Sequence, residues 1–374
     1  RPERQNLAAI RAGEFEGLAA KLADPAWAPD FGPTAPHPTA GATVIGARDF
    51  LVAYNINLNT TSTRRANAVA FDLREQGRVV TDAQGAPVRG ADGEPLREPG
   101  RLKGVKGIGW YIEEYGIAQV SLNLADLAQT PLHAAFDAAC EAAAARGLRV
   151  TGSELVGLVP HAALLAAGRH YLAKQSRSLG VSDDALVHIA VKSLGLDDLA
   201  PFDPSAKVIE LAMRRPADER LVRMTVRDFA AEAASDSPVP GGGSVAGVVG
   251  ALGAAMGTMV ANLSAGKRGW DDRWAEFSAW AEQGQAAVRT LLRLVDEDTR
   301  AFDAVLAAMR LPKDTPAAAA VRAEALEAAT RRAIEVPLAV LRTAMASMEL
   351  MVEMAAIGLP RSISDAGVGG VRAP

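Results

Sequence analysis

The sequence predicts an α+β N-terminal part, with a ferredoxin-like βαββαβ subdomain, followed by an all-α helical bundle. Strand and helix patterns alternate in the order β-α-β-β-α-β between residues 50 and 160. That order is the one of the split βαβ arrangement. After Met224 we find helical patterns and no convincing strand pattern, which is typical of a bundle.

Four segments show the apolar and polar alternation of half-buried strands. They are FLVAYNINL (50–58), VKGIGWYIEE (105–114), IAQVSLNL (117–124) and LRVTGSELVGLVP (148–160). Tyr115 and Gly116 join the middle two, so a hairpin is expected there. The segment 78–100 is polar and rich in Gly and Pro, and it predicts a flexible insertion.

Helical periodicity marks the remaining elements. In the first part it covers 61–77, 131–147, 161–175 and 182–195. In the second part it covers 225–235, 244–265, 271–293, 294–310, 316–332 and 337–356. The uncharged stretch 237–266 is long enough to cross a membrane, but Gly and Ala dominate it. Gly253 and Gly257 have the spacing of close helix contacts, so we expect a helix buried in a soluble bundle and no membrane span.

Composition excludes some classes of protein. The net charge of −4 gives no nucleic-acid-binding signature. A single cysteine, Cys140, cannot form an intrachain disulfide, and with no signal peptide at the start this predicts a cytoplasmic protein. The chain begins with Arg1 and ends in VGGVRAP, so we expect both ends to be cut. Its histidines have no metal-ligand or triad spacing, so we expect no metal; they are His37, His133, His161, His170 and His188.

Uncharged polar side chains follow two predicted strands. Alternation places Asn55 and Asn57 on one face of the first strand, and Gln119, Ser121 and Asn123 on one face of a hairpin strand. This face either meets solvent or binds a heterocycle or carboxylate through its amides, and the sequence leaves both open.

Charged residues near the sheet are less specific. Lys103 and Lys106 bracket Gly104 and are suited to an anionic substrate, although lysines at a strand entrance are usually just solvated. Glu154 lies in an apolar strand, so it needs either an edge position or a partner.

Asp298 interrupts an apolar stripe. The stripe has steps of three and four residues, as on an amphipathic helix: Val288, Leu291, Val295, Asp298, Phe302, Val305 and Met309. A carboxyl held among apolar side chains suits proton transfer, whereas a salt bridge or a wet helix edge would make it structural. Asp296, Glu297 and Asp303 point elsewhere, and we expect them to be solvated. Upstream, PGGGS (240–244) offers a tight turn, with Ser244 as a helix cap.

Several long motifs resemble known families. AIRAGEFEGLAAKL, WAPDFGPTAPHPTAGATVIGAR, FLVAYNINL, LREQGR, RLKGVKGIGWYIEE and GSELVGLVP resemble glutamate formimidoyltransferase. PGGGSVAG, LVDEDTRAFDAVLAAMRLPK and SISDAGVG are similar to formimidoyltetrahydrofolate cyclodeaminase. The resemblance implies the end of a transferase N-terminal subdomain at 1–48, its C-terminal subdomain at 49–200, a linker at 201–222 and a truncated cyclodeaminase domain at 223–374.

The resemblance also implies activities and sites. The family transfers a formimino group from N-formimino-L-glutamate to tetrahydrofolate, then closes the product to 5,10-methenyltetrahydrofolate with loss of ammonia. Asp298 falls on its cyclodeaminase catalytic carboxylate. The implied folate contacts are Gly32, Pro33, Thr34, Ala35, Pro36, His37, Pro38, Thr39, Ala40, Gly41, Asn55, Asn57, Lys103 and Glu154. Glu154 departs from the Gln of animal members.

The resemblance predicts limits as well. The family's catalytic transferase histidine has no counterpart among the five histidines here, so we expect no transferase turnover. Homo-oligomerisation is expected from kinship and from the small-residue helix. Two alternatives remain at this stage: a single-activity enzyme like methenyltetrahydrofolate cyclohydrolase, and a non-catalytic folate-binding scaffold.

Overall fold

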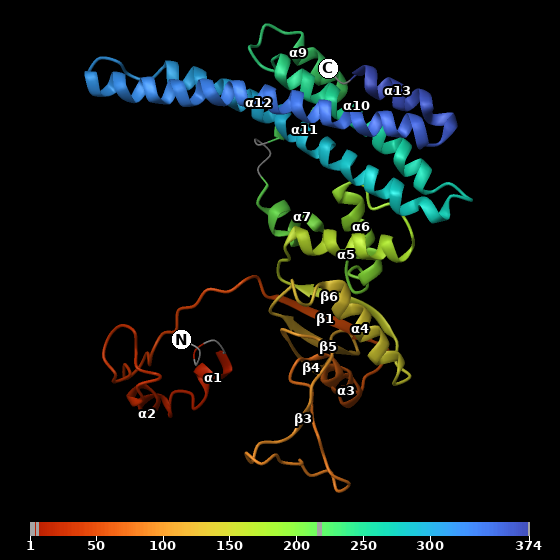
Figure 1. Cartoon of the computed structure of the whole chain (residues 1–374). Coiled ribbons are helices and arrows are strands. Elements are labelled where there is room, and N and C mark those ends of the chain that lie inside the picture. The colour runs from red at the N-terminus through yellow and green to blue at the C-terminus, as the bar shows by residue number, and fades with distance from the viewer. Residues whose placement is uncertain (1–3, 5–6, 215–218, 373–374) are drawn as a thin grey trace. The chain divides into compact units, whose positions relative to one another are not determined.

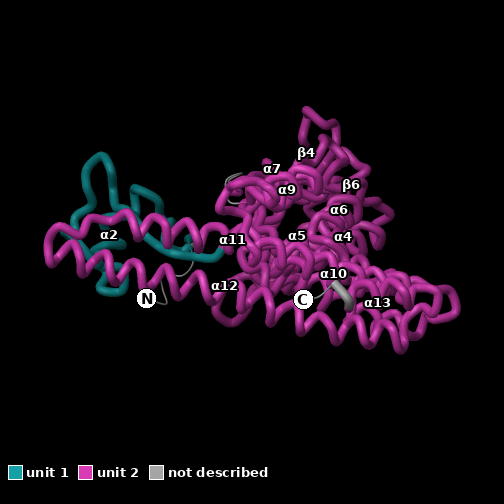
Figure 2. Tube along the Cα trace, turned by 90° about the horizontal axis from the view of Figure 1, so that it is seen from above, with its two compact units in different colours: residues 1–49 teal, residues 50–374 magenta. Residues whose placement is uncertain are grey.

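The computed structural model describes residue 4, residues 7–214 and residues 219–372. The chain divides into two compact units at Asp49 and Phe50 (Figure 2). The first unit contains two short helices, α1 (Leu7–Arg11) and α2 (Leu18–Ala23). The Lys21 ammonium ties them together, because it donates to the carbonyls of Ala9, Ile10 and Ala12 at 2.6–2.9 Å.

The second unit opens with a four-stranded antiparallel sheet of β1 (Val52–Leu58), β4 (Val105–Ile112), β5 (Ile117–Leu124) and β6 (Val150–Val156) (Figure 1). The strand order is β4-β5-β1-β6. Helices α3 (Thr63–Leu73) and α4 (Leu132–Ala144) supply the two crossovers. This is the predicted ferredoxin-like arrangement, and the prediction is confirmed.

The helix-covered face of this sheet holds the core. Tyr54, Ile56 and Leu58 of β1 are fully buried, as the alternation predicts. At Gly109 of β4 the backbone touches α3, where an added Cβ would lie 2.1 Å from the amide nitrogen of Asn67. The Asn67 side chain bonds both the N–H and the C=O of Gly109 at 3.0 Å. That edge of the sheet is therefore locked to α3.

Two segments have more structure than the sequence suggests. The expected flexible insertion at 78–100 forms a ribbon of β2 (Arg78–Val79) and β3 (Arg97–Glu98), extended by further bridges. The expected linker contains α7 (Pro204–Lys207) and α8 (Ile209–Ala212). It packs back onto the subdomain, because Val208 is fully buried and bridges Val159. A few apolar side chains are therefore enough to pack this otherwise polar segment against the subdomain.

Helices α5 (His161–Lys174) and α6 (Asp183–Leu194) lead to the helical part. Its elements are α9 (Val226–Ala233), α10 (Gly242–Ala265), η3 (Asp271–Arg273), α11 (Trp274–Met309), α12 (Pro316–Ile357), η4 (Pro360–Ser362) and α13 (Ile363–Arg372) (Figure 1). The predicted bundle is confirmed.

The predicted breaks near 293 and within 332–337 are wrong, because α11 and α12 are each one continuous helix. No helix-breaking residue lies near 293. In α12, Pro337 is inside the helix. Val336 and Val340 on either side of it are buried against α10 and α11, so packing holds the helix across the missing hydrogen bond.

Helix α10 is, within the described residues, the one helix long and apolar enough to cross a membrane, and 56% of its most apolar window is buried inside the protein. Its small residues account for that burial. An added Cβ at Gly257 would lie 3.0 Å from Leu350 of α12, and one at Gly284 of α11 would lie 2.0 Å from the Thr258 hydroxyl. The predicted packing of α10 inside the bundle is confirmed.

A cluster of titratable side chains joins α4 to α5. The Asp137 carboxylate lies 2.9 Å from both His170 Nε2 and Lys174 Nζ, and accepts from the Tyr171 hydroxyl at 3.1 Å. The His133 ring stacks on His170 with centroids 4.3 Å apart. Its Nδ1 is buried with no partner among the described residues. Burial, followed by the charge of His170, lowers the pKa of His133 to about 4.

This shift predicts a pH dependence of stability. Unfolded histidine protonates near pH ~6.5, whereas folded His133 protonates only at about 4. The folded state thus binds fewer protons, and the free energy of unfolding should fall as pH drops through this window. Urea unfolding of His133→Phe between pH 7 and 4 should show a shallower decline than the parent chain. Exposed His188→Phe is the control, and equal slopes for all three proteins would contradict the assignment.

Candidate functional site in the helical domain and on the sheet

Asp298 of α11 meets the first turn of α10. Its carboxylate lies 3.0 Å from the Ser244 hydroxyl, and the side chain is half-buried. Ser244 itself is fully buried, and its oxygen is also 3.0 Å from the Val295 carbonyl and 3.3 Å from the Thr299 hydroxyl. The Ser244 hydroxyl has one proton to donate, so it can alternate between the Val295 carbonyl and Asp298. Asp298 therefore has an orienting neighbour and keeps an open side.

Gly243 makes this contact possible. A Cβ at this position would lie 2.3 Å from Asp298 Oδ1 and 2.6 Å from its carboxyl carbon. The α10 N-cap is Gly241, without a side-chain cap, so the prediction that Ser244 caps the helix is wrong. Ser244 lies inside the first turn and points at α11 instead. The carboxylate thus sits against the positive end of the helix dipole.

Part of the apolar stripe around Asp298 is exposed, although the sequence predicts a buried stripe. Leu291 and Val295 are fully buried, but Phe302 is 39% exposed and Met309 53% exposed. The physical reason is visible in Figure 1, where the end of α11 and the start of α12 project beyond the other helices of the bundle. Asp298 lies at the border, where the stripe passes from core to surface.

Asp296 behaves differently from the expectation. It is 6% exposed, and its carboxylate accepts from the backbone N–H groups of Leu221 and Val222 at 2.7 and 3.3 Å. The prediction of a solvated Asp296 is wrong, because the segment before α9 covers this side of α11. Glu297 is also largely covered and pairs with Arg293 and Arg332, whereas Asp303 is exposed as expected.

The amide-rich face of the sheet lies opposite α3 and α4. Gln119 donates to Asn57 Oδ1 at 2.8 Å, and Asn57 donates to Asp198 at 3.0 Å. Asn57 and Gln119 are fully buried, so the solvent interpretation is wrong for both. Most of their hydrogen bonds are internal. Of the side-chain atoms of these two residues, Gln119 Oε1 is buried with no hydrogen-bond partner in the described part of the chain. Nothing in the sequence pattern signals Asp198, which reaches this face from the loop after α6.

Asn55 and Glu154 form a second pair. They are register partners on β1 and β6, and Asn55 Nδ2 lies 3.4 Å from Glu154 Oε2. Glu154 therefore has the partner that its place in an apolar strand requires. Lys103 does not join them: it is exposed, and its ammonium lies 3.8 Å from Glu75. The solvated interpretation suits Lys103 best, and Lys106 is exposed as well.

The loop from Gly32 to Gly41, in the first unit, is closed on itself. His37 and Gly41 exchange two backbone hydrogen bonds of 2.9 Å. His37 Nδ1 accepts from the N–H groups of Thr39 and Ala40 at 3.3 and 3.1 Å. These two hydrogen bonds hold the backbone after His37 in a turn, so the His37 ring has a structural role in the loop. Across the residues that the structure describes, no group of three His, Cys, Asp or Glu side chains could hold a metal ion.

The contrast between two neighbouring aspartates gives a prediction. Asp296→Ala leaves two backbone N–H groups without acceptors, so we expect a loss of roughly 2–4 kcal/mol in the free energy of unfolding. Exposed Asp303→Ala should change it by less than about 0.5 kcal/mol. Urea titrations of the three proteins provide the measurement. Equal stability of Asp296→Ala and the parent chain would show that Asp296 does not hold the segment before α9.

Family models match nearly the whole chain. Residues 1–48 match the N-terminal subdomain of the formiminotransferase domain, and residues 53–214 match the formiminotransferase domain. Residues 225–373 match the formiminotransferase-cyclodeaminase model. The three matches follow the same order as the first unit, the sheet subdomain and the helical bundle.

Individual relatives agree with these matches. Formimidoyltransferase-cyclodeaminase of Sus scrofa is 44% identical over 356 residues, covering 95% of this chain and 62% of the relative. Glutamate formimidoyltransferase of Streptococcus pyogenes is 39% identical, covering 46% of this chain and 50% of the relative. Methenyltetrahydrofolate cyclohydrolase of Methylorubrum extorquens is 39% identical, covering 38% and 69%.

The chain spans about three fifths of the length of the formimidoyltransferase-cyclodeaminases that it matches, since it covers 62% of the pig protein and 64% of the mouse protein. Within that span it contains both kinds of domain in the same order. The chain is a homologue of these proteins and belongs to the formimidoyltransferase-cyclodeaminase family.

Proposed function

We propose that the helical domain catalyses cyclodeamination of 5-formimidoyltetrahydrofolate to 5,10-methenyltetrahydrofolate and ammonia, as part of a folate-dependent enzyme of histidine degradation. Tetrahydrofolate is the one-carbon carrier and a substrate, and no metal takes part. The observation that carries the proposal is the Asp298 carboxylate, held by Ser244 where Gly243 leaves room for it. The family matches over both domains support it.

The chemistry needs one group that moves a proton. N10 of the folate attacks the amidine carbon and a ring closes. The amidine nitrogen must then gain a proton to leave as ammonia. A half-buried carboxylate with one open side can take the proton released at N10 and return it to the leaving nitrogen. Ser244 orients the carboxylate beside the first turn of α10.

The sheet subdomain is proposed to take part in transfer of the formimino group from N-formimino-L-glutamate to tetrahydrofolate. Glu154 is half-buried and pairs with Asn55, which is 5% exposed, so Glu154 is the more accessible of these two proposed folate contacts. Asn57 acts indirectly, because Gln119 and Asp198 occupy its amide. Lys103 and the Gly32–Gly41 loop remain proposed contacts on the strength of the family resemblance.

We do not expect residues 1–374 by themselves to turn over as a transferase. None of the five histidines matches the family's catalytic one, and proton transfer at N5 needs such a group. His133 is stacked on His170, and His37 is committed to its own loop. Incubating the chain with N-formimino-L-glutamate and tetrahydrofolate, and measuring free glutamate, tests this directly. Glutamate release at an ordinary enzymatic rate would refute it.

A second candidate function is hydrolysis of methenyltetrahydrofolate. The match to the Methylorubrum extorquens cyclohydrolase over 144 residues of this chain favours it. The same carboxylate can serve either reaction, because both move a proton next to the same folate carbon. Ammonia release from formimidoyl-folate, compared with hydrolysis of methenyl-folate, separates the two.

Self-association in the cytoplasm is also proposed. Exposed apolar residues on α12 are separated by alternating steps of four and three, the spacing of a helix-packing seam: Ile334, Leu338, Leu341, Met345, Met348 and Val352. A second copy of the chain is the proposed occupant. Sedimentation should show a smaller assembly for Met345→Lys than for Val321→Lys, an exposed position off the seam. Identical sedimentation would contradict this.

The role of Asp298 gives the main test of function. Asp298→Asn keeps the size and one acceptor oxygen but cannot shuttle a proton, so cyclodeamination should fall by about 100-fold or more. Because the side chain is only half-buried, the unfolding midpoint should barely move. Asp303→Asn is the matched control on the exposed side of α11. Undiminished ammonia and methenyl-folate formation by Asp298→Asn would refute the proposal.

A further inference from the structure

The loop between α5 and α6, residues 175–182, contacts the helical domain. Both helices belong to the core of the sheet subdomain, since Leu164 and Leu194 are fully buried in one cluster with the strands. Figure 1 shows the two helices between the sheet and the bundle. The loop thus carries contacts from the sheet subdomain to α10 and α11, and these contacts determine how firmly the two domains are held together.

Gly180 brings the tip of this loop against α11. It is buried, and an added Cβ would lie 2.2 Å from the Ala281 Cβ and 2.3 Å from the Ala281 carbonyl carbon. Even the smallest side chain would therefore overlap the α11 backbone. The φ angle of Gly180 lies outside the left-handed region, so the backbone conformation does not require glycine here. The close approach of the loop to α11 explains this glycine.

Polar groups are paired across the same contact. The Leu179 N–H donates to the Ser278 hydroxyl of α11 at 2.9 Å, and Asn262 Nδ2 of α10 donates to the Gly180 carbonyl at 2.8 Å. Ser278 is 2% exposed, so the first bond is shielded from water. A buried polar group that loses its partner costs free energy. These two bonds therefore oppose any movement of the loop away from α10 and α11.

The loop is ordered by its own hydrogen bonds at both ends. At its start the Arg177 N–H donates to the Leu172 carbonyl at 3.0 Å, and Ser176 has a φ of 52°, as in a helix end closed by a left-handed residue. At its end the Ser182 hydroxyl caps α6 by accepting from the Ala185 N–H at 3.2 Å. A preorganised loop loses little conformational entropy when it binds a partner surface.

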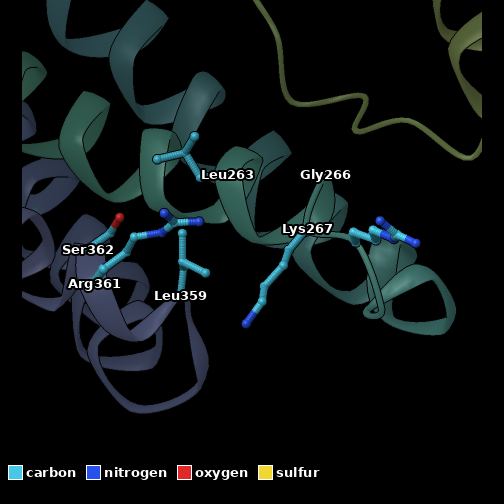
Figure 3. Close-up of a pocket in the computed structure, with 7 residues that line it drawn as sticks. Leu263, Gly266, Lys267, Leu359, Arg361 and Ser362 are labelled. Carbon is cyan, nitrogen blue, oxygen red and sulfur yellow. The ribbon is translucent and has the colours of Figure 1, made fainter.

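An ion pair and a cavity mark the edges of the contact. Arg289 of α11 lies 3.3 Å from Asp183 in the first turn of α6. On α10, Leu263 follows Asn262 and lines a cavity of about 490 Å³ next to η4 (Figure 3). Residues 175–182, all of which the structure describes, do not line that cavity. The loop contact is therefore separate from it.

A second attachment on α11 restricts the same domain movement. Small interfaces between domains ordinarily allow relative motion, so one contact alone holds an orientation poorly. The segment before α9 also reaches α11, where the Leu221 N–H donates to Asp296 at 2.7 Å. Ala281 and Asp296 lie roughly 22 Å apart along one continuous helix at about 1.5 Å per residue. Two attachments at this spacing oppose rotation about either one.

We propose that residues 175–182 form a latch that holds the sheet subdomain in one orientation on the helical domain. Gly180 provides the close approach, and the bonds of its carbonyl to Asn262 and of Leu179 to Ser278 fix the register. The latch goes beyond the proposed reaction. Its contact at Ala281 lies roughly 26 Å along α11 from Asp298 at about 1.5 Å per residue, so it keeps the two domains aligned without touching the proposed catalytic group.

Distances between spin labels test the latch on the whole chain. Labels are placed on Lys106→Cys of β4 and Asp303→Cys of α11, both exposed positions, with Cys140→Ser in all proteins. Dilution with unlabelled chain restricts the signal to distances within one chain. The parent should show one narrow distance distribution, and Gly180→Ala one at least about twice as broad. Gly367→Ala on α13 is the control, because its added Cβ has nothing within 4 Å.

A second variant keeps the test informative if Gly180→Ala does not fold. Asn262→Asp adds no volume but replaces the donor to the Gly180 carbonyl with an acceptor, so it should broaden the distribution too. Arg289→Gln should broaden it less, because a partly exposed ion pair contributes little. A broad distribution in the parent chain, or a narrow one kept by both Gly180→Ala and Asn262→Asp, would overturn the latch. Neither result involves folate turnover, so failure here leaves the proposed reaction standing.

Discussion

A close contact between the first turn of α10 and the middle of α11 organises the candidate site. At Gly243 the α10 backbone comes so near the Asp298 carboxylate that a single added carbon would collide with it. Ser244, one residue further on, is fully buried and reaches the same carboxylate and the Val295 carbonyl. A residue with a Cβ at 243 would push the Asp298 carboxylate out of this position. The position of the proposed catalytic carboxylate thus follows from the absence of a side chain on the facing helix.

Other glycines of α10 also allow neighbouring helices to approach closely. A Cβ at Gly247 would lie 3.0 Å from Val295, and one at Gly257 would lie 3.0 Å from Leu350 of α12, so both contacts are tight. Helices packed this closely gain dispersion contacts along their whole length, which compensates for the low apolar area of Gly and Ala. At its N-terminal end, α10 makes the contact with Asp298 of α11.

Much of this was predictable because periodicity reflects burial. Residue types alternate along the strands because successive side chains lie on opposite faces of the sheet. The steps of three and four residues on α11 single out Asp298 as the polar residue on an apolar stripe. Three things could not be read from the sequence. Asp296 is buried by a segment 74 to 75 residues away. Asn57 and Gln119 are satisfied by each other and by Asp198, a pairing that depends on register and on a distant loop. Pro337 is tolerated because packing holds the helix around it.

One pair of variants tests the central contact most directly. Gly242→Ala adds a carbon where nothing lies within 4 Å, whereas Gly243→Ala adds the same carbon against the Asp298 carboxylate. Rates of methenyl-folate formation should be near the parent value for Gly242→Ala and at least about 100-fold lower for Gly243→Ala. Parent-like rates for Gly243→Ala would contradict the account, because the carboxylate would then not need its place against α10.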